Sequence, residues 1–131
     1  MKILIVDDDP ISRKVLRSIL ATQGHCDLAS DGEDAYSCVT QAIEEGESYD
    51  LVTLDINMPD MDGQEVLARI RSFEESRGIR GLDQVKIIMA TGLEDSRNIM
   101  KAFNTGCEGY IVKPFDQEKI LEKVRELFEK P

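Results

Sequence analysis

The fold class is indicated first by residues 3–10, which read Ile-Leu-Ile-Val-Asp-Asp-Asp-Pro. Four consecutive apolar residues, most of them β-branched, are typical of a strand that is covered on both faces of a sheet. Apolar residues at helical spacing follow Pro10 and predict an amphipathic helix that ends near Gly24. They are Ile11, Val15, Leu16, Ile19 and Leu20. The stretch therefore predicts a buried strand that leads directly into a helix.

The same succession of strand and helix recurs along the chain. Further strands are predicted at residues 25–29, 50–54, 85–90 and 109–112. Apolar stripes at helical spacing follow them, with members at Ala35, Val39, Ala42, Ile43; Val66, Leu67, Ile70; Ile99, Met100, Phe103; and Ile120, Leu121, Val124, Leu127, Phe128. The polar segment 74–84 is predicted to be a helix end followed by a loop. This alternation predicts an α/β fold, a doubly wound five-stranded parallel sheet with helices on both faces.

Length and charge limit the classes of function. The chain of 131 residues has the size of one domain, which we expect to span residues 1–131. Its 16 basic and 26 acidic residues give a net charge of −10, so direct binding to nucleic acid is not expected. No stretch has the length of a membrane span, and the N-terminal apolar run is too short for a signal peptide. The three cysteines lack metal-type or redox-type spacing, and we expect a cytoplasmic protein with reduced thiols and no membrane contact.

Polar residues follow the predicted strands at the points where these strands end. Asp7 and Asp8 come after the first strand, Asp55 after the third, Thr91 after the fourth and Lys113 after the fifth. Because parallel strands end at one edge of the sheet, where such folds bind their ligands, we expect these side chains to meet there.

Carboxylates that are packed together repel one another, and a bound cation removes that repulsion. Mg²⁺ prefers hard oxygen ligands, so Asp8 and Asp55 are candidate direct ligands, with Asp7 acting through water and the carbonyl of Asn57 completing the protein side. The absence of Cys and His from this set argues against zinc. A carboxylate can also attack phosphorus to form an acyl phosphate. Lys113 and the Thr91 hydroxyl are then expected to hold phosphoryl oxygens.

Four motifs together resemble one family. They are Ile-Val-Asp-Asp-Asp-Pro at 5–10, Asp-Ile-Asn-Met-Pro-Asp-Met-Asp-Gly at 55–63, Ala-Thr-Gly at 90–92 and Gly-Tyr-Ile-Val-Lys-Pro-Phe at 109–115. In this order and spacing they resemble the CheY-like receiver domain of two-component response regulators, over essentially the whole chain.

The resemblance implies a flavodoxin-like strand order, 2-1-3-4-5. It implies that Asp55 is the phosphoacceptor, supplied by a phosphohistidine on a histidine kinase or a histidine phosphotransfer protein, with Mg²⁺ bound at Asp7, Asp8, Asp55 and the Asn57 carbonyl. Thr91 and Tyr110 would form a switch, with Lys113 as a further phosphoryl ligand, and the bond before Pro114 would be cis. The chain would act on a downstream protein target as a signalling switch. It would catalyse only its own phosphorylation and dephosphorylation, and so would not be an enzyme in the ordinary sense.

Two other functions stay open at this point. An aspartate-nucleophile phosphatase of the haloacid dehalogenase type also uses Mg²⁺, Asp, Thr and Lys, but its general acid lies two residues after the nucleophile, where this chain has Asn57. The chain also lacks a cap domain. A receiver-like module could instead bind partners without phosphorylation.

Several residues also have simpler interpretations. Asp9 before Pro10 is expected to cap a helix and is left out of the site. Tyr110 could be packed without switching. Asn57 and Leu93 flank the expected phosphoryl site, and we expect them to tune the lifetime of the acyl phosphate. The long segment 74–84 resembles receivers that belong to hybrid kinases, so the chain is either a stand-alone regulator or part of a longer protein.

Overall fold

The computed structural model describes residues 1–92 and 96–128. Its strands are β1 (Lys2–Val6), β2 (His25–Ala29), β3 (Leu51–Asp55), β4 (Lys86–Thr91) and β5 (Gly109–Val112). Its α-helices are α1 (Pro10–Leu20), α2 (Gly32–Glu44), α3 (Gly63–Ser76), α4 (Ser96–Thr105) and α5 (Gln117–Phe128), and a short 3₁₀ helix, η1, spans Gly81–Asp83. No helix in these ranges combines the length and the apolar character that crossing a bilayer requires.

The strands form one parallel sheet in the order β2-β1-β3-β4-β5. This confirms the predicted fold class and strand order. The chain winds outward in one direction from β1 to β2 and in the other from β3 to β5. Because β1 and β3 are neighbours, the direction of winding reverses between them, and this is where such folds bind ligands. The register pairs Val6 with Leu54 and Asp55 with Ala90, so the ends of these strands lie level with one another.

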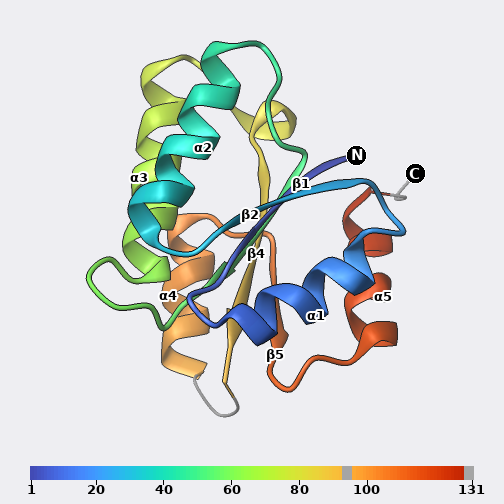
Figure 1. The fold of residues 1–131 in the computed structure, drawn as a ribbon. Coiled ribbons are helices and arrows are strands. Elements are labelled where there is room, and N and C mark those ends of the chain that lie inside the picture. Colours follow the sequence, from blue (N-terminus) through green and yellow to red (C-terminus); the bar gives the residue numbers. More distant parts are fainter. Residues whose placement is uncertain (93–95, 129–131) are drawn as a thin grey trace.

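The sheet lies between two layers of helices, as Figure 1 shows with the sheet nearly edge-on. Helices α2, α3 and α4 cover one face, and α1 and α5 cover the other. Side chains of β1 alternate between the two cores, with Leu4 and Val6 in the first and Ile3 and Ile5 in the second. Full burial of one such side chain stabilises the fold by about 1.5–3 kcal/mol. The uninterrupted apolar run is thus explained by burial on both faces.

Aspartates precede and cap several of the helices, and Asp116 before α5 is one of them. Asp9, Asp31 and Asp62 each have extended backbone, and each side chain accepts a hydrogen bond from a backbone N–H of the first turn. Such caps typically stabilise a helix by about 1 kcal/mol. Asp9 therefore has the capping role that its place before Pro10 predicts.

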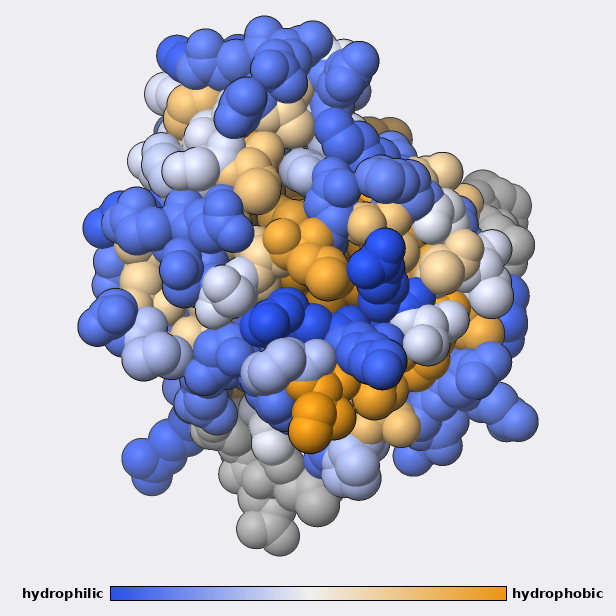
Figure 2. Space-filling view, in the orientation of Figure 1, coloured by the Kyte–Doolittle hydropathy of each residue, from blue (hydrophilic) through white to orange (hydrophobic). Residues whose placement is uncertain are grey.

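The apolar stripes that were predicted for α1 and α4 are only partly buried. Leu16, Ile19 and Leu20 of α1 are buried, but the Ile11 side chain is 72% exposed and Val15 is also exposed. Figure 2 shows hydrophobic side chains at the surface over α1. The first turn of α1 has no buried side chain, and the buried ones lie further along the helix. Spacing predicts a helical face, but it does not tell how far that face reaches over the sheet.

Helix α4 shows the same discrepancy. Met100 and Phe103, which were predicted to mark its apolar face, are both exposed. Among the described side chains of α4, Ala102 alone is buried. The helix is therefore attached to the rest of the fold by few apolar contacts.

The segment 74–84 is a helix end followed by a loop, as predicted. Helix α3 continues to Ser76, and η1 lies within the predicted loop. Glu74 is 1% exposed, forms an ion pair with Arg71 (Nη1–Oε1, 2.8 Å) and accepts a hydrogen bond from the Val85 N–H. Arg71 also donates to the Gly106 carbonyl and forms an ion pair with Glu108 at 2.8 Å. These charged residues tie the end of α3 to the starts of β4 and β5.

Candidate functional site

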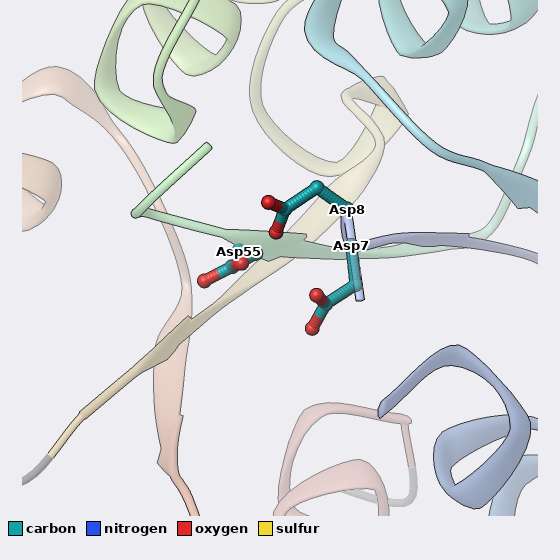
Figure 3. Close-up of side chains that lie close together, drawn as sticks. All are labelled: Asp7, Asp8 and Asp55. Carbon is teal, nitrogen blue, oxygen red and sulfur yellow. The ribbon is translucent and has the colours of Figure 1, made fainter. Parts of the chain in front are cut away.

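Three carboxylates converge where the winding reverses. Asp7 and Asp8 follow β1, and Asp55 is the last residue of β3. One oxygen from each of the three side chains lies within 4.8 Å of the others. Figure 3 shows the Asp8 side chain directed toward Asp55, with the Asp7 carboxylate beside them. The structure thus brings Asp55 together with two acids that are distant from it in sequence, as their places at strand ends predict.

The cluster is buried on one side and open on the other. Asp7 is fully buried and Asp55 is 2% exposed, whereas Asp8 is exposed. The loop after β3 passes close to Asp55: the Asn57 N–H donates to Asp55 Oδ1 at 3.3 Å. A Cβ at Gly63 would lie 2.3 Å from the Asp55 carbonyl oxygen, so only glycine lets α3 begin at this point. A small ligand can therefore approach Asp55 from the side of Asp8.

Lys113 lies opposite the carboxylates. Its Nζ is 3.0 Å from Asp7 Oδ2 and 3.4 Å from Asp55 Oδ2. Its backbone N–H donates to the Thr91 carbonyl at 2.8 Å, which ties the loop after β5 to the end of β4. The peptide bond between Lys113 and Pro114 is cis, as the resemblance implies. One ammonium faces three carboxylates, so the cluster keeps an excess of negative charge.

This excess changes proton binding at the site. Burial, and then repulsion from Asp7, raise the pKa of Asp55 to about 7, although the Lys113 ammonium opposes the shift. Burial alone would lower the pKa of Lys113, but its contacts with Asp7 and Asp55 outweigh this effect and raise it. A divalent cation would relieve the repulsion between the carboxylates. Oxygen ligands in an acidic, half-open cluster fit Mg²⁺, which keeps some of its waters.

Thr91 and Tyr110 lie at different depths. Thr91 ends β4, its side chain is fully buried, and its hydroxyl donates to the Gly92 carbonyl at 3.3 Å. Tyr110, in β5, is 39% exposed, and its ring packs edge-to-face against Phe103 with 6.3 Å between centroids. Tyr110 is thus partly exposed at the surface and packs against α4. Leu93 lies outside the described residues.

One residue in contact with the site was not predicted. The Arg13 side chain, on the first turn of α1, donates from Nη1 to the Asp7 carbonyl at 2.6 Å. The only sequence signal is its position four residues after the helix cap Asp9, one helical turn along α1.

Comparison with known sequences identifies one family and similar proteins. The model of the response regulator receiver domain matches residues 3–125. Chemotaxis protein CheY of Treponema pallidum is 36% identical over 128 residues, which cover 94% of this chain and 79% of that protein. Hybrid signal transduction histidine kinase L of Dictyostelium discoideum is 36% identical over 126 residues, 95% of this chain, but the chain spans only 7% of the length of that kinase.

Solved structures share the fold. The CheX–CheY complex with BeF₃ and Mg²⁺ from Borrelia burgdorferi contains a chain with a TM-score of 0.83 and 32% identity, covering 99% of this chain and 90% of that chain. The complex of the Saccharomyces cerevisiae phosphotransfer protein Ypd1 with the receiver domain of Ssk1 contains one with a TM-score of 0.82 and 28% identity, covering 96% and 87%.

Proposed function

The chain belongs to the response regulator receiver domain family, and from this premise we propose that Asp55 is its phosphoacceptor. The observation that carries the proposal is the position of the Lys113 ammonium, 3.4 Å from Asp55 and opposite two further carboxylates. Receiver domains act as signalling switches in two-component systems. We propose that residues 1–131 form one such domain.

The reaction requires Asp55 as a carboxylate. One of its oxygens forms a bond to phosphorus while the P–N bond of the phosphohistidine breaks, and the bonding electron pair leaves on the imidazole nitrogen. Lys113 binds one phosphoryl oxygen by charge, and the Thr91 hydroxyl donates a hydrogen bond to another. Attack by water on phosphorus later breaks the new P–O bond, which restores the carboxylate and releases phosphate.

Asp7, Asp8, Asp55 and the carbonyl of Asn57 would hold Mg²⁺. The bound ion would neutralise charge on the phosphoryl oxygens. The acidic cluster supports this assignment, as does the cation named in the Borrelia complex. Within the set, Asp7 is held by Lys113 and Asp8 faces solvent, so an ion held here would be reached by solvent on the Asp8 side.

Thr91 and Tyr110 would convert phosphorylation into a change of surface. Movement of the Thr91 hydroxyl toward the phosphoryl oxygen would vacate space behind it, and the Tyr110 ring would turn inward. The exposed position of Tyr110 against Phe103 supports this role, because the ring is at the surface before phosphorylation. The altered face would then bind a downstream protein target.

The donor would be a histidine kinase or a histidine phosphotransfer protein. The similarity to the Ssk1 receiver in complex with Ypd1 supports a phosphotransfer partner. We place the chain in the cytoplasm, consistent with its three free cysteines, and assign it no nucleic-acid or membrane contact of its own. Its catalysis would be limited to its own phosphorylation and dephosphorylation.

The test is incubation with Mg²⁺ and acetyl phosphate, followed by intact-protein mass spectrometry. We expect one phosphoryl adduct, which hydroxylamine removes and which Asp55→Asn abolishes. Asp62→Asn, at the cap of α3, is the matched control and should keep the adduct. Absence of an adduct on the unsubstituted chain would refute the proposal. Repeated turnover of varied phosphate esters would instead favour the phosphatase.

A further inference from the structure

The loop between β1 and α1 holds Asp7 at three points. The Asp7 N–H donates to the Ala29 carbonyl at 3.2 Å, and Asp7 Oδ1 accepts from the Asp9 N–H at 2.9 Å. The third contact is the hydrogen bond from Arg13 Nη1 to the Asp7 carbonyl, at 2.6 Å. Arg13 therefore closes a ring from the first turn of α1 back to the end of β1.

Arg13 lies in a first helical turn that is well capped. Asp9 caps α1 through the Ile11 N–H and the Ser12 hydroxyl, and the Asp9 carbonyl accepts from the Arg13 N–H at 3.1 Å. The Arg13 side chain is half-buried. The backbone of Arg13 is thus held within the helix, and the hydrogen bond from its guanidinium to the Asp7 carbonyl restrains the loop between β1 and α1.

Asp8 is the residue that depends on this restraint. Its carboxylate makes no hydrogen bond or ion pair with any residue in the ranges 1–92 and 96–128. The backbone therefore sets the direction of its Cα–Cβ bond without help from a side-chain contact, and the peptide plane before it contains the Asp7 carbonyl that Arg13 holds. Asp7, by contrast, is fixed independently by Asp9 and Lys113.

We propose that Arg13 is a positioning residue for Mg²⁺, acting through the peptide between Asp7 and Asp8 to aim the Asp8 carboxylate at the ion. The inference rests on the proposed metal site. The effect of Arg13 on Mg²⁺ affinity is then opposite to that expected from its charge, because a cationic side chain close to the site repels Mg²⁺. Loss of the charge alone would tighten binding, whereas loss of the restraint weakens it. The sign of the change separates the two effects.

The experiment measures Mg²⁺ affinity by isothermal titration calorimetry, without any phosphodonor. We expect Arg13→Met to weaken binding by about three- to tenfold, the equivalent of one hydrogen bond. Arg13→Lys, which keeps a donor and the charge, should restore at least half of that loss on a logarithmic scale. Arg17→Met removes the same charge one turn further along α1 from an exposed position, and should leave the affinity unchanged or slightly tighter.

A double-mutant cycle tests the route through Asp8. In an Asp8→Ala background, Arg13→Met should change Mg²⁺ affinity by less than about twofold. Equal weakening in both backgrounds would overturn the proposal, as would unchanged or tighter binding by Arg13→Met alone. Circular dichroism and urea unfolding confirm that each variant is folded. These outcomes leave the proposed function intact, whereas failure of the unsubstituted chain to bind Mg²⁺ would overturn the metal site and this inference together.

Discussion

At the scale of single residues, the charges of the site determine which groups bind protons. Three carboxylates and one ammonium share a pocket in which two of the acids are almost fully buried. Burial and mutual repulsion favour the protonated form of Asp55 and hold its pKa near 7. A proton and a metal ion bound at the proposed site would therefore compete for the same carboxylate.

This competition predicts the pH dependence of the metal-free protein. The pKa of Asp55 is higher in the folded chain than in the unfolded one, so the folded state binds more protons and the free energy of unfolding falls as pH rises from about 4 to about 7. The fall should be roughly 2–4 kcal/mol, from about 1.4 kcal/mol per pKa unit. Urea denaturation in EDTA at about pH 5 and about pH 8 measures it. Asp55→Asn should remove most of the difference, and Mg²⁺ should recover stability at the higher pH.

Lys113 should contribute more to phosphorylation than to Mg²⁺ binding. Its ammonium faces Asp7 and Asp55 and repels a cation placed between them. We expect Lys113→Ala to slow adduct formation with acetyl phosphate on the order of 10- to 100-fold, because a charged donor to the phosphoryl oxygens is lost. Mg²⁺ affinity should change by less than about threefold. Calorimetry and mass spectrometry give the two values, and an equal loss of both would show that the assigned role is wrong.

At the scale of elements, the helices differ in how they are held. Helix α3 is anchored at its end by Arg71 and Glu74, while α4 exposes Met100 and Phe103. A polar contact helps to hold α4: Gln64, 6% exposed in the first turn of α3, donates to the Asn98 carbonyl. The side-chain oxygen of Gln64, Oε1, accepts no hydrogen bond from a described residue. Among the described residues, α4, which follows the Thr91 strand, thus buries fewer apolar side chains than the other α-helices.

Gln64→Met should loosen α4 without unfolding the chain. The substitution removes the hydrogen bond to Asn98 together with an unpartnered buried oxygen, so the global free energy of unfolding should change by less than about 1 kcal/mol. Amide hydrogen exchange within residues 96–105 should accelerate by roughly tenfold, because local opening becomes easier. Gln41→Met, at an exposed position of α2, is the control. Unchanged exchange in α4 would show that the contact does not hold the helix.

Arg71→Met should have the opposite profile. It leaves Glu74 as a buried carboxylate without its cation, which costs about 3–5 kcal/mol when a buried pair is broken. A second substitution, Glu74→Gln, should recover part of the loss. Mg²⁺ affinity should be unaffected, because Arg71 binds at the starts of β4 and β5 and the proposed metal site lies at the ends of the strands. Urea denaturation and calorimetry separate the two effects, and a loss of Mg²⁺ affinity would contradict the assignment.

At the scale of the whole molecule, the parallel sheet brings all strand ends to one edge and surrounds them with an acidic chain. The net charge of −10 attracts cations to the site, but it also makes the folded surface repel itself. This repulsion has a measurable cost.

Monovalent salt should therefore stabilise the metal-free protein. Raising NaCl from low concentration to about 0.15 M shortens the screening length to about 8 Å. We expect the melting temperature in EDTA to rise by about 2–5 °C, which corresponds to roughly 1 kcal/mol. The increment should be smaller with saturating Mg²⁺, because the ion would neutralise charge in the cluster of Asp7, Asp8 and Asp55. A fall in melting temperature with salt would show that attractive ion pairs outweigh the repulsion.

Much of the fold could be predicted from local patterns. Features that depend on neighbours in the chain can be predicted from the sequence. They include the apolar run of β1, the helix cap Asp9 and the alternation of strands and helices. The strand ends at Asp7, Asp55, Thr91 and Lys113 followed from the same patterns. Burial of α1 and α4 was predicted less well, because spacing defines a helical face but not the length of sheet beneath it.

The sequence by itself determined that the chain is an α/β domain and that acids, a hydroxyl and a lysine follow its strands. Tertiary structure decided which of them meet, because the distance from Lys113 to Asp55 depends on how the whole sheet is wound. Only the tertiary structure revealed the contact of Arg13 with the Asp7 carbonyl and the buried ion pair of Glu74. Both contacts involve charged side chains, which local sequence patterns place in solvent. Where a charge lies is a property of the packed molecule, and the chemistry of the site follows from that placement.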